Sequence, residues 1–174
     1  MSQSGPLLNG RFSGNLYRAL NPIYAREPLS GKGAELHGGR FNPKGVPALY
    51  AALDPATAIR EANQVGDLQP TMLVSYSAEI GPIFDGTDAD ELKRYAMNPA
   101  LLGNHVWRRN MLNGIAVPTQ DFAMRLVADG YAALLVASFA RGGSISGLNL
   151  VLWDWSKKAG SLLVIDREDR LKKM

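Results

Sequence analysis

The glycine-rich segment 36–45, LHGGRFNPKG, carries residue types that suit the binding of an anion. Gly38 and Gly39 precede Arg40, and two glycines let the backbone approach a ligand closely. A guanidinium donates bidentate, permanently charged hydrogen bonds, which suit a diphosphate. The segment lacks the terminal Lys-Ser or Lys-Thr and the following helix of a phosphate-binding loop. Two interpretations remain: a diphosphate contact at Arg40, or a turn that carries a surface arginine.

Three further side chains could face a pocket, although each also has a structural explanation. Glu61 lies at the edge of the apolar side of an expected helix, where it could instead form an ion pair. Ser138 ends the apolar run AALLVAS, and a side chain at the end of a buried strand can project into a pocket or bond the backbone. Tyr50 could belong to the core. Taken one by one, these residues leave both interpretations open.

The sequence contains few residues that could support metal or thiol chemistry. His37 and His105 are the two histidines, and neither lies in a metal-binding pattern such as HExxH. The chain has no Cys, which removes Cys-rich zinc sites, iron–sulfur clusters, thiol catalysis and disulfides. We therefore expect an activity that needs no metal.

Length and composition are those of one globular domain, with 174 residues, 46% hydrophobic and 20% charged. The first residues lack the basic and apolar parts of a signal peptide. The longest uninterrupted apolar run, residues 131–137, is too short to cross a bilayer. We expect a cytoplasmic protein that is neither secreted nor inserted into a membrane.

The charge balance argues against a nucleic-acid partner. The formal net charge is +3, of which residues 167–174 contribute +2 and the rest of the chain +1. A nucleic-acid-binding protein usually concentrates positive charge on one face to neutralise phosphates. We therefore expect no direct contact with nucleic acid.

Turn signals and apolar runs predict a loose arm over residues 1–15 and one domain over residues 16–174. The connection 21–47 holds five Gly and four Pro, and a connection of this length is more often a binding loop than a linker. The expected strands cover residues 16–19, 48–52, 72–80, 132–139, 148–153 and 161–166. The expected helices run from Asp54-Pro55 to Val65, from Asp88, from Asn98-Pro99 through Leu102, Val106 and Arg109, and from Thr119 to Asp129.

These elements predict the fold class. Strands that follow one another largely without helical crossovers, with the helices in two clusters, favour α+β over a doubly wound parallel sheet. The sheet should therefore be mixed or antiparallel. On the helix that begins at Asp54, Arg60 should point toward water.

The order of the singled-out residues resembles the RES-domain family, which is named for Arg, Glu and Ser and comprises toxins of bacterial toxin–antitoxin pairs. The resemblance covers about residues 16–155, and the block from GGRFNPKG to Glu61 is its most specific part. It rests on Arg18 in LYRAL, Arg40 and Tyr50 in GGRFNPKGVPALYAA, Glu61 in ATAIREA, Ser138 in LLVAS and Asn149 in GLNLVLW.

The resemblance implies an enzyme that consumes NAD, with a fold similar to ADP-ribosyltransferases, in which a cleft in a split β-sheet flanked by helices holds the dinucleotide. It implies that Arg18 and Arg40 contact the diphosphate and ribose, and that Tyr50 offers an aromatic face to nicotinamide. Glu61 would be the catalytic acid, with Arg40 in the catalytic group as well.

Three more positions complete the site that the resemblance implies. Ser138 would be a supporting polar contact of the catalytic group and of NAD, and Asn149 would bind the same substrate. His37 lies where a ribose-binding histidine would be welcome, but it could equally be a loop histidine near solvent.

The expected chemistry is cleavage of the nicotinamide–ribose bond, which builds positive charge on the sugar. A carboxylate such as that of Glu61 stabilises this charge, while arginines fix the diphosphate. The ADP-ribose could pass to water, inorganic phosphate or a protein. Two alternatives are a mono-ADP-ribosyltransferase for one cellular protein and a nucleotide-binding module without catalysis. A ribonuclease toxin is disfavoured, because no histidine pair accompanies a basic groove.

A toxin of this kind implies a partner. We expect a cognate antitoxin with an Xre-like helix-turn-helix part that blocks the cleft, so that contact with DNA belongs to the partner. The chain could assemble as a homo-oligomer or as a toxin–antitoxin hetero-oligomer, and the sequence leaves both open.

Overall fold

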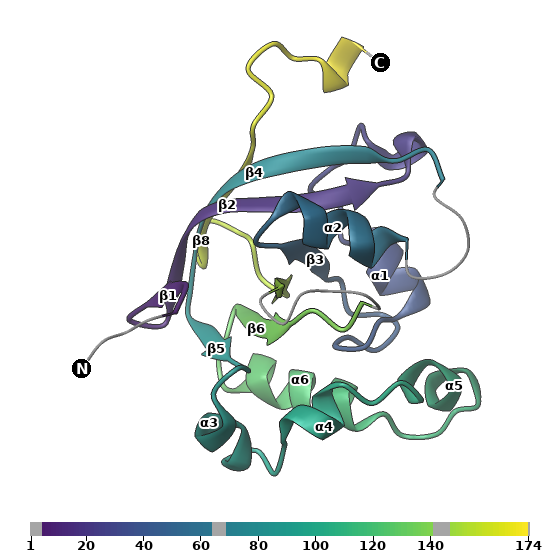
Figure 1. Cartoon of the computed structure of the whole chain (residues 1–174), viewed down its shortest axis with the longest axis vertical. Coiled ribbons are helices and arrows are strands. Elements are labelled where there is room, and N and C mark those ends of the chain that lie inside the picture. Colours follow the sequence, from purple (N-terminus) through teal and green to yellow (C-terminus); the bar gives the residue numbers. More distant parts are fainter. Residues whose placement is uncertain (1–4, 64–68, 141–146, 174) are drawn as a thin grey trace.

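The computed structural model describes residues 5–63, 69–140 and 147–173. Within this part of the chain, eight strands form one sheet in the order β5-β6-β7-β3-β2-β4-β8, with β1 paired to β2 (Figure 1). The strands are β1 (Leu7–Leu8), β2 (Arg11–Leu20), β3 (Leu49–Ala52), β4 (Met72–Ile80), β5 (Ile83–Asp85), β6 (Ala133–Ala137), β7 (Leu148–Leu152) and β8 (Gly160–Val164).

Six α-helices and two short 3-10 helices accompany the sheet in the described residues. The α-helices are α1 (Lys32–His37), α2 (Pro55–Ala62), α3 (Ala89–Lys93), α4 (Pro99–Leu102), α5 (Trp107–Leu112) and α6 (Pro118–Ala128). The 3-10 helices are η1 (Pro22–Tyr24) and η2 (Leu171–Lys173). None of these helices is long and apolar enough to cross a membrane.

The sheet consists of two parts that meet at one point. Strands β2 and β4 pair over the whole length from Phe12 to Leu20, whereas β2 and β3 share the single register pair Tyr17 with Ala52. Strands β5, β6, β7 and β3 form one part, and β2, β4 and β8 form the other. Because β2 and β3 are joined so briefly, the two parts can separate beside the joint and leave room for a cavity.

The alternation of strand residues divides the core into two clusters. The first cluster joins the two parts of the sheet and includes Leu16 and Tyr76 from one part and Leu135 and Leu150 from the other. The second lies between the β5-β6-β7 part and the helices that Figure 1 shows beneath it. It includes Leu134, which neighbours Leu135 on β6 and therefore points to the opposite face. The first cluster thus holds the two parts of the sheet together, and the second holds the helices against the sheet.

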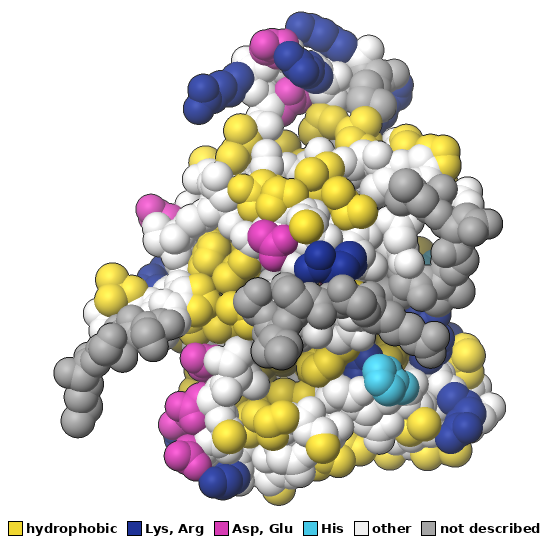
Figure 2. Space-filling model, in the orientation of Figure 1, with side chains coloured by type: hydrophobic (Ala, Val, Ile, Leu, Met, Phe, Trp, Pro, Cys, Tyr) yellow, Lys and Arg dark blue, Asp and Glu magenta, His cyan; other side chains and the backbone are white. Residues whose placement is uncertain are grey.

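The expected α+β class with a mixed sheet and flanking helices is confirmed. Strands β5 and β6 run parallel, and the other described strand pairs are antiparallel. Figure 2 shows acidic side chains over α3 and basic ones around the C-terminal segment, so charges of both signs lie on this face.

Several expected boundaries differ from the structure. Strand β2 begins at Arg11, so residues 11–15 belong to the sheet and not to a loose arm. Their Gly, Ser and Asn content does not prevent this, because β4 supplies a hydrogen-bonded ladder and Phe12 is buried. The expected long helix after Asn98 is divided into α4 and α5, because Gly103 caps α4. Val65, the expected end of α2, lies outside the described residues.

Arg60 corrects another expectation, since its side chain does not point to water. It is half-buried, and its Nη2 donates to Thr57 Oγ1 at 2.8 Å. Its Nε is buried and has no hydrogen-bond partner among the described residues. The hydrogen bond to the Thr57 side chain, one turn earlier on α2, holds the guanidinium against the helix.

Helix α2 begins with a strong N-cap. Asp54 Oδ1 accepts from the Thr57 amide at 2.8 Å, and Thr57 Oγ1 donates to Asp54 Oδ2 at 2.6 Å. Partial burial raises the pKa of Asp54, but the hydrogen bonds from Thr57 outweigh it, and the pKa lies below its usual value. The cap therefore favours the ionised carboxylate.

We predict that Asp54→Ala lowers the free energy of unfolding by about 1 kcal/mol at neutral pH, because the first turn of α2 loses its cap. Since the folded pKa is lowered, the contribution is present above the unfolded pKa and is lost as pH falls through the folded value. Urea denaturation at a series of pH values measures both effects. Asp54→Asn, which keeps a capping oxygen, should retain most of the stability without this pH dependence; equal stability of Asp54→Ala and the wild type at pH 7 would contradict the assignment.

Candidate functional site

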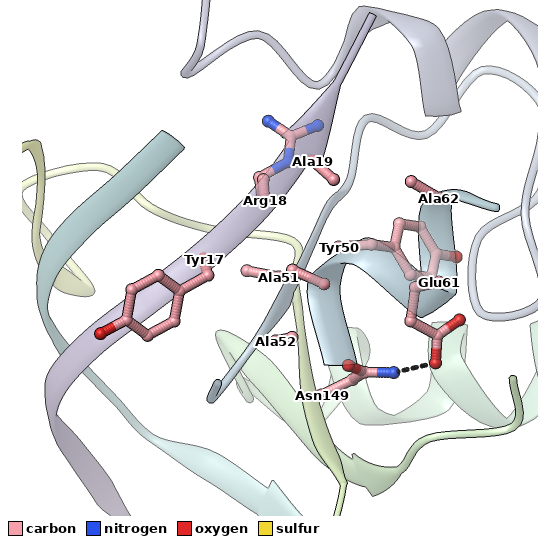
Figure 3. A pocket seen from close by; sticks show the side chains of 10 residues that line it. Tyr17, Arg18, Ala19, Tyr50, Ala51, Ala52, Glu61, Ala62 and Asn149 are labelled. Carbon is pink, nitrogen blue, oxygen red and sulfur yellow. Dashed lines mark hydrogen bonds between the residues drawn. The ribbon is translucent and has the colours of Figure 1, made fainter. Parts of the chain in front are cut away.

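A cavity of about 220 Å³ opens where the two parts of the sheet separate. Its walls come from β2, β3, α2 and one residue of β7 (Figure 3). Arg18 lies on the β2 side, and Tyr50 and Glu61 line the cavity from β3 and α2. The space exists because much of the remaining lining is alanine, at positions 19, 51, 52, 58 and 62.

Glu61 is held by two polar side chains that come from distant strands. Its Oε1 accepts from Ser138 Oγ and from Asn149 Nδ2, both at 2.6 Å. Asn149 pairs with Val136 across β6 and β7, and Ser138 lies two residues beyond Val136, so both side chains leave the same face of the sheet. Figure 3 shows the bond from Asn149. Two donors on one oxygen fix the orientation of the carboxylate at the cavity wall.

Close packing beside this group sets the distance of α2 from the sheet. Thr57, one helical turn before Glu61, is fully buried. A Cβ at Gly147 would lie 2.9 Å from Thr57 Oγ1 and 3.3 Å from Ser138 Cβ. Glycine at this position therefore lets α2 approach closely enough for Glu61 to reach Ser138.

Tyr50 forms the wall beside Glu61 and is also tied to the glycine-rich segment. Its hydroxyl donates to Asn42 Oδ1 at 2.7 Å and accepts from the Phe41 amide at 3.1 Å. Burial raises the pKa of Tyr50 above its usual range, so the hydroxyl stays protonated. A Cβ at Gly39 would lie 2.5 Å from this hydroxyl, which explains the need for glycine there.

The sequence analysis missed Asn42, which organises the glycine-rich segment. Its side chain is fully buried, and its Nδ2 donates to the carbonyls of Ala34 and Val46, each at 2.9 Å. The signal that could have found it is Asn before Pro43, a pair typical of turns. Asn42 thus connects α1, the glycine-rich segment and Tyr50.

Buried polar side chains also hold the carbonyls of this segment. Thr119 Oγ1 donates to the Arg40 carbonyl at 2.6 Å, and Gln120 Nε2 donates to the Gly39 carbonyl at 2.8 Å. Trp153 Nε1 donates to the Phe41 carbonyl at 3.0 Å. The first turn of α6 and Trp153 therefore fix the backbone of residues 39–41, and the sequence analysis had assigned Thr119 only to a helix start.

The Arg40 side chain does not line the cavity of Glu61. Its Nη1 donates to the carbonyls of Leu102 and Asn104 at 3.0 and 2.8 Å, and its guanidinium lies 4.6 Å from the centre of the Phe139 ring. Burial lowers the pKa of Arg40, while the negative charge of Glu61 opposes this shift. Arg40 thus joins the glycine-rich segment to the connection between α4 and α5, with Glu61 close enough to act on its charge.

Arg18 borders two cavities. Its Nη1 donates to the Pro28 carbonyl at 2.9 Å, and Tyr76 Oη donates to the same carbonyl at 2.7 Å. Besides the cavity of Glu61, Arg18 lines a second cavity of about 490 Å³ that extends to His37. His37 is exposed at the end of α1 and does not reach the first cavity.

The structure thus brings together Arg18, Tyr50, Glu61, Asn149 and, through its bond to Glu61, Ser138. It places Arg40 behind the glycine-rich segment and His37 at the second cavity. In the described parts of the chain, no group of three His, Cys, Asp or Glu side chains could hold a metal ion.

We predict that Asn42→Ala lowers the free energy of unfolding by about 2–4 kcal/mol, because buried carbonyls and the Tyr50 hydroxyl lose their partner. Thermal unfolding and urea denaturation measure the loss. Asn15→Ala, at an exposed position on β2, is the matched control and should change stability by less than about 0.5 kcal/mol. Equal melting temperatures of the two variants would show that the Asn42 contacts add nothing to stability.

Comparison with solved structures shows a related fold. A chain in the crystal structure of the M. tuberculosis MbcT-MbcA toxin-antitoxin complex aligns with a TM-score of 0.60 and 20% sequence identity. The alignment covers 90% of the present chain and 83% of the other. No curated protein sequence matches the chain.

Comparison with protein families identifies the family of the chain, and the matched range covers the whole site. The model of the RES domain matches residues 15–172, a range that includes Arg18, Glu61 and Ser138. The chain therefore belongs to the RES-domain family.

Proposed function

We propose that this protein is a toxin of a toxin–antitoxin pair that cleaves the nicotinamide–ribose bond of NAD. The single observation that carries the proposal is the carboxylate of Glu61, which Ser138 and Asn149 hold at the wall of a cavity between Tyr50 and Arg18. Membership of the RES-domain family supports it. The site of action would be the cytoplasm, where a dinucleotide substrate is available.

In this reaction the bond between the ribose C1′ and the pyridinium nitrogen breaks, and its electron pair leaves with neutral nicotinamide. The sugar then carries the positive charge of an oxocarbenium-like transition state. The Glu61 carboxylate stabilises that charge, and its fixed orientation means that little reorganisation is needed when the charge develops. An oxygen nucleophile attacks C1′ and loses its proton, which completes the transfer of ADP-ribose.

The other residues have roles that follow from their positions. The Tyr50 ring offers an apolar wall for nicotinamide, and its hydroxyl is occupied by Asn42. Arg18 lines both cavities and suits the diphosphate. Ser138 and Asn149 orient Glu61. Arg40, expected at the diphosphate, donates to the carbonyls of Leu102 and Asn104 in this structure and interacts with Glu61 through its charge.

The acceptor of ADP-ribose is water, inorganic phosphate or a protein side chain. Incubation of the purified protein with labelled NAD, with and without phosphate and with cell lysate, separates the three cases by their products. We expect nicotinamide release together with ADP-ribose, its phosphorylated form or labelled protein. Intact NAD under all conditions would refute the proposal.

We predict that Glu61→Gln lowers turnover by about 10² or more while the affinity for NAD changes little, because the lost charge acts mainly in the transition state. Glutamine keeps the oxygen that accepts from Ser138 and Asn149, so the melting temperature should be preserved. Nicotinamide release and melting are measured on the same preparation.

Glu79→Gln is the matched control, because Glu79 is exposed on β4 outside the cavity. It should keep full turnover. If Glu61→Gln instead melts earlier and turns over normally per folded molecule, Glu61 is a structural residue and the assignment fails.

We further propose a cognate antitoxin with an Xre-like helix-turn-helix part that covers the cavity. Family membership and the fold shared with a chain of a toxin–antitoxin complex support this partner. We predict that the co-expressed pair purifies as one complex that releases no nicotinamide, because the cavity is blocked. Size-exclusion chromatography and the release assay measure this, and the mass also gives the oligomeric state. A stable complex with the full activity of the free chain would contradict blocking.

A further inference from the structure

The second cavity is larger than the first, and Arg18 lines both. The cavity of Glu61 measures about 220 Å³, whereas sites for ligands of drug size measure about 300–1,000 Å³. A dinucleotide therefore needs more room than the first cavity offers. The second cavity, of about 490 Å³, supplies it between the end of β2, η1 and α1.

Apolar side chains of the second cavity suit a flat base. Ile23, Tyr24 and Leu36 line it with exposed fractions of 72%, 65% and 58%, although large apolar side chains are usually buried. An aromatic ring at the mouth of a cavity stacks readily on a purine. If nicotinamide binds at Glu61 and the diphosphate at Arg18, as proposed above, the second cavity is the place left for the adenosine half of the dinucleotide.

Further basic side chains line the second cavity besides Arg18. Arg26, Lys32 and His37 line it together with one acidic residue, Glu27. Within the described parts of the chain, neither the Lys32 ammonium nor the His37 imidazole has a hydrogen bond or an ion pair. Two basic groups without protein partners at one cavity suit an additional anionic group of the ligand.

We propose that the second cavity accepts an adenosine that carries a 2′-phosphate, so that the enzyme uses NADP at least as efficiently as NAD. This inference rests on the proposed cleavage of NAD. An acidic residue at the adenosine ribose selects for NAD through the 2′-hydroxyl, whereas basic residues accommodate the 2′-phosphate of NADP. Here the basic groups outnumber the single acidic residue, and Lys32 supplies a compact charge for the phosphate.

The first test compares kcat/KM for nicotinamide release from NADP and from NAD. We expect a ratio of one or more for the wild type. Lys32→Glu should lower this ratio by about tenfold, because a negative charge then faces the 2′-phosphate in place of the ammonium group. Lys157→Glu makes the same change of charge at an exposed position away from both cavities and should leave the ratio unchanged. A wild-type ratio well below one, or equal effects of the two variants, would overturn the inference.

The second test needs no turnover. Adenosine 2′,5′-bisphosphate should bind the wild-type protein more tightly than AMP in a calorimetric titration, and Lys32→Glu should remove the preference. Equal binding of the two compounds refutes the 2′-phosphate site. If the preference is found but neither dinucleotide releases nicotinamide, the proposed reaction fails while the binding site stands. A cavity that binds neither compound and is instead protected from hydrogen exchange by the antitoxin would be a protein interface, which also refutes the inference.

Discussion

Strands β2 and β3 share one register pair, Tyr17 with Ala52, and the site depends on this brief joint. A longer ladder would close the space that Arg18, Tyr50 and Glu61 line. No joint would leave the two parts of the sheet free to move apart. The first core cluster draws residues from both parts and holds them at a constant separation. The walls of the cavity are therefore set by the packing of the strands on both sides of this joint.

Buried polar groups then place the reactive side chains on this frame. The carbonyls of residues 39–41 accept hydrogen bonds from Thr119, Gln120 and Trp153. Asn42 donates to the carbonyls of Ala34 and Val46, so the Tyr50 hydroxyl meets a fixed partner. Each of these side chains would cost free energy if left unpaired, which favours a single arrangement of the segment. Two donors, Ser138 and Asn149, likewise fix the Glu61 carboxylate. Satisfied hydrogen bonds thus order this part of the site.

The small net charge of the chain hides a local separation of charge. The Glu61 carboxylate lies in one cavity, Arg26 and Lys32 lie along the other, and Arg18 lines both. A ligand that develops positive charge at one end and carries phosphates at the other matches this arrangement. Arg40 takes part in two interactions. Its guanidinium donates to the carbonyls of Leu102 and Asn104, and its charge acts on Glu61.

Local patterns in the sequence predicted the elements well wherever one face is buried. The alternation in β4 and the Asp54-Pro55 start of α2 are examples, because a strand period and a capping residue act over a few residues. The residue types of the site were also evident, with Glu61 on its helix and Tyr50 on its strand. The polar residues at the start of β2 led to the wrong expectation of a loose arm. The partner strand β4 decides whether such a segment joins a sheet.

Only the tertiary structure decided which of these residues meet. Ser138 and Asn149 lie 77 and 88 residues from Glu61, yet they donate to one of its oxygens. Arg40 donates to carbonyls 62 and 64 residues away, whereas the family resemblance had implied that it contacts the ligand. Sequence periodicity states which face a side chain occupies, whereas the order of the strands and the packing of helices on them determine what lies opposite that face.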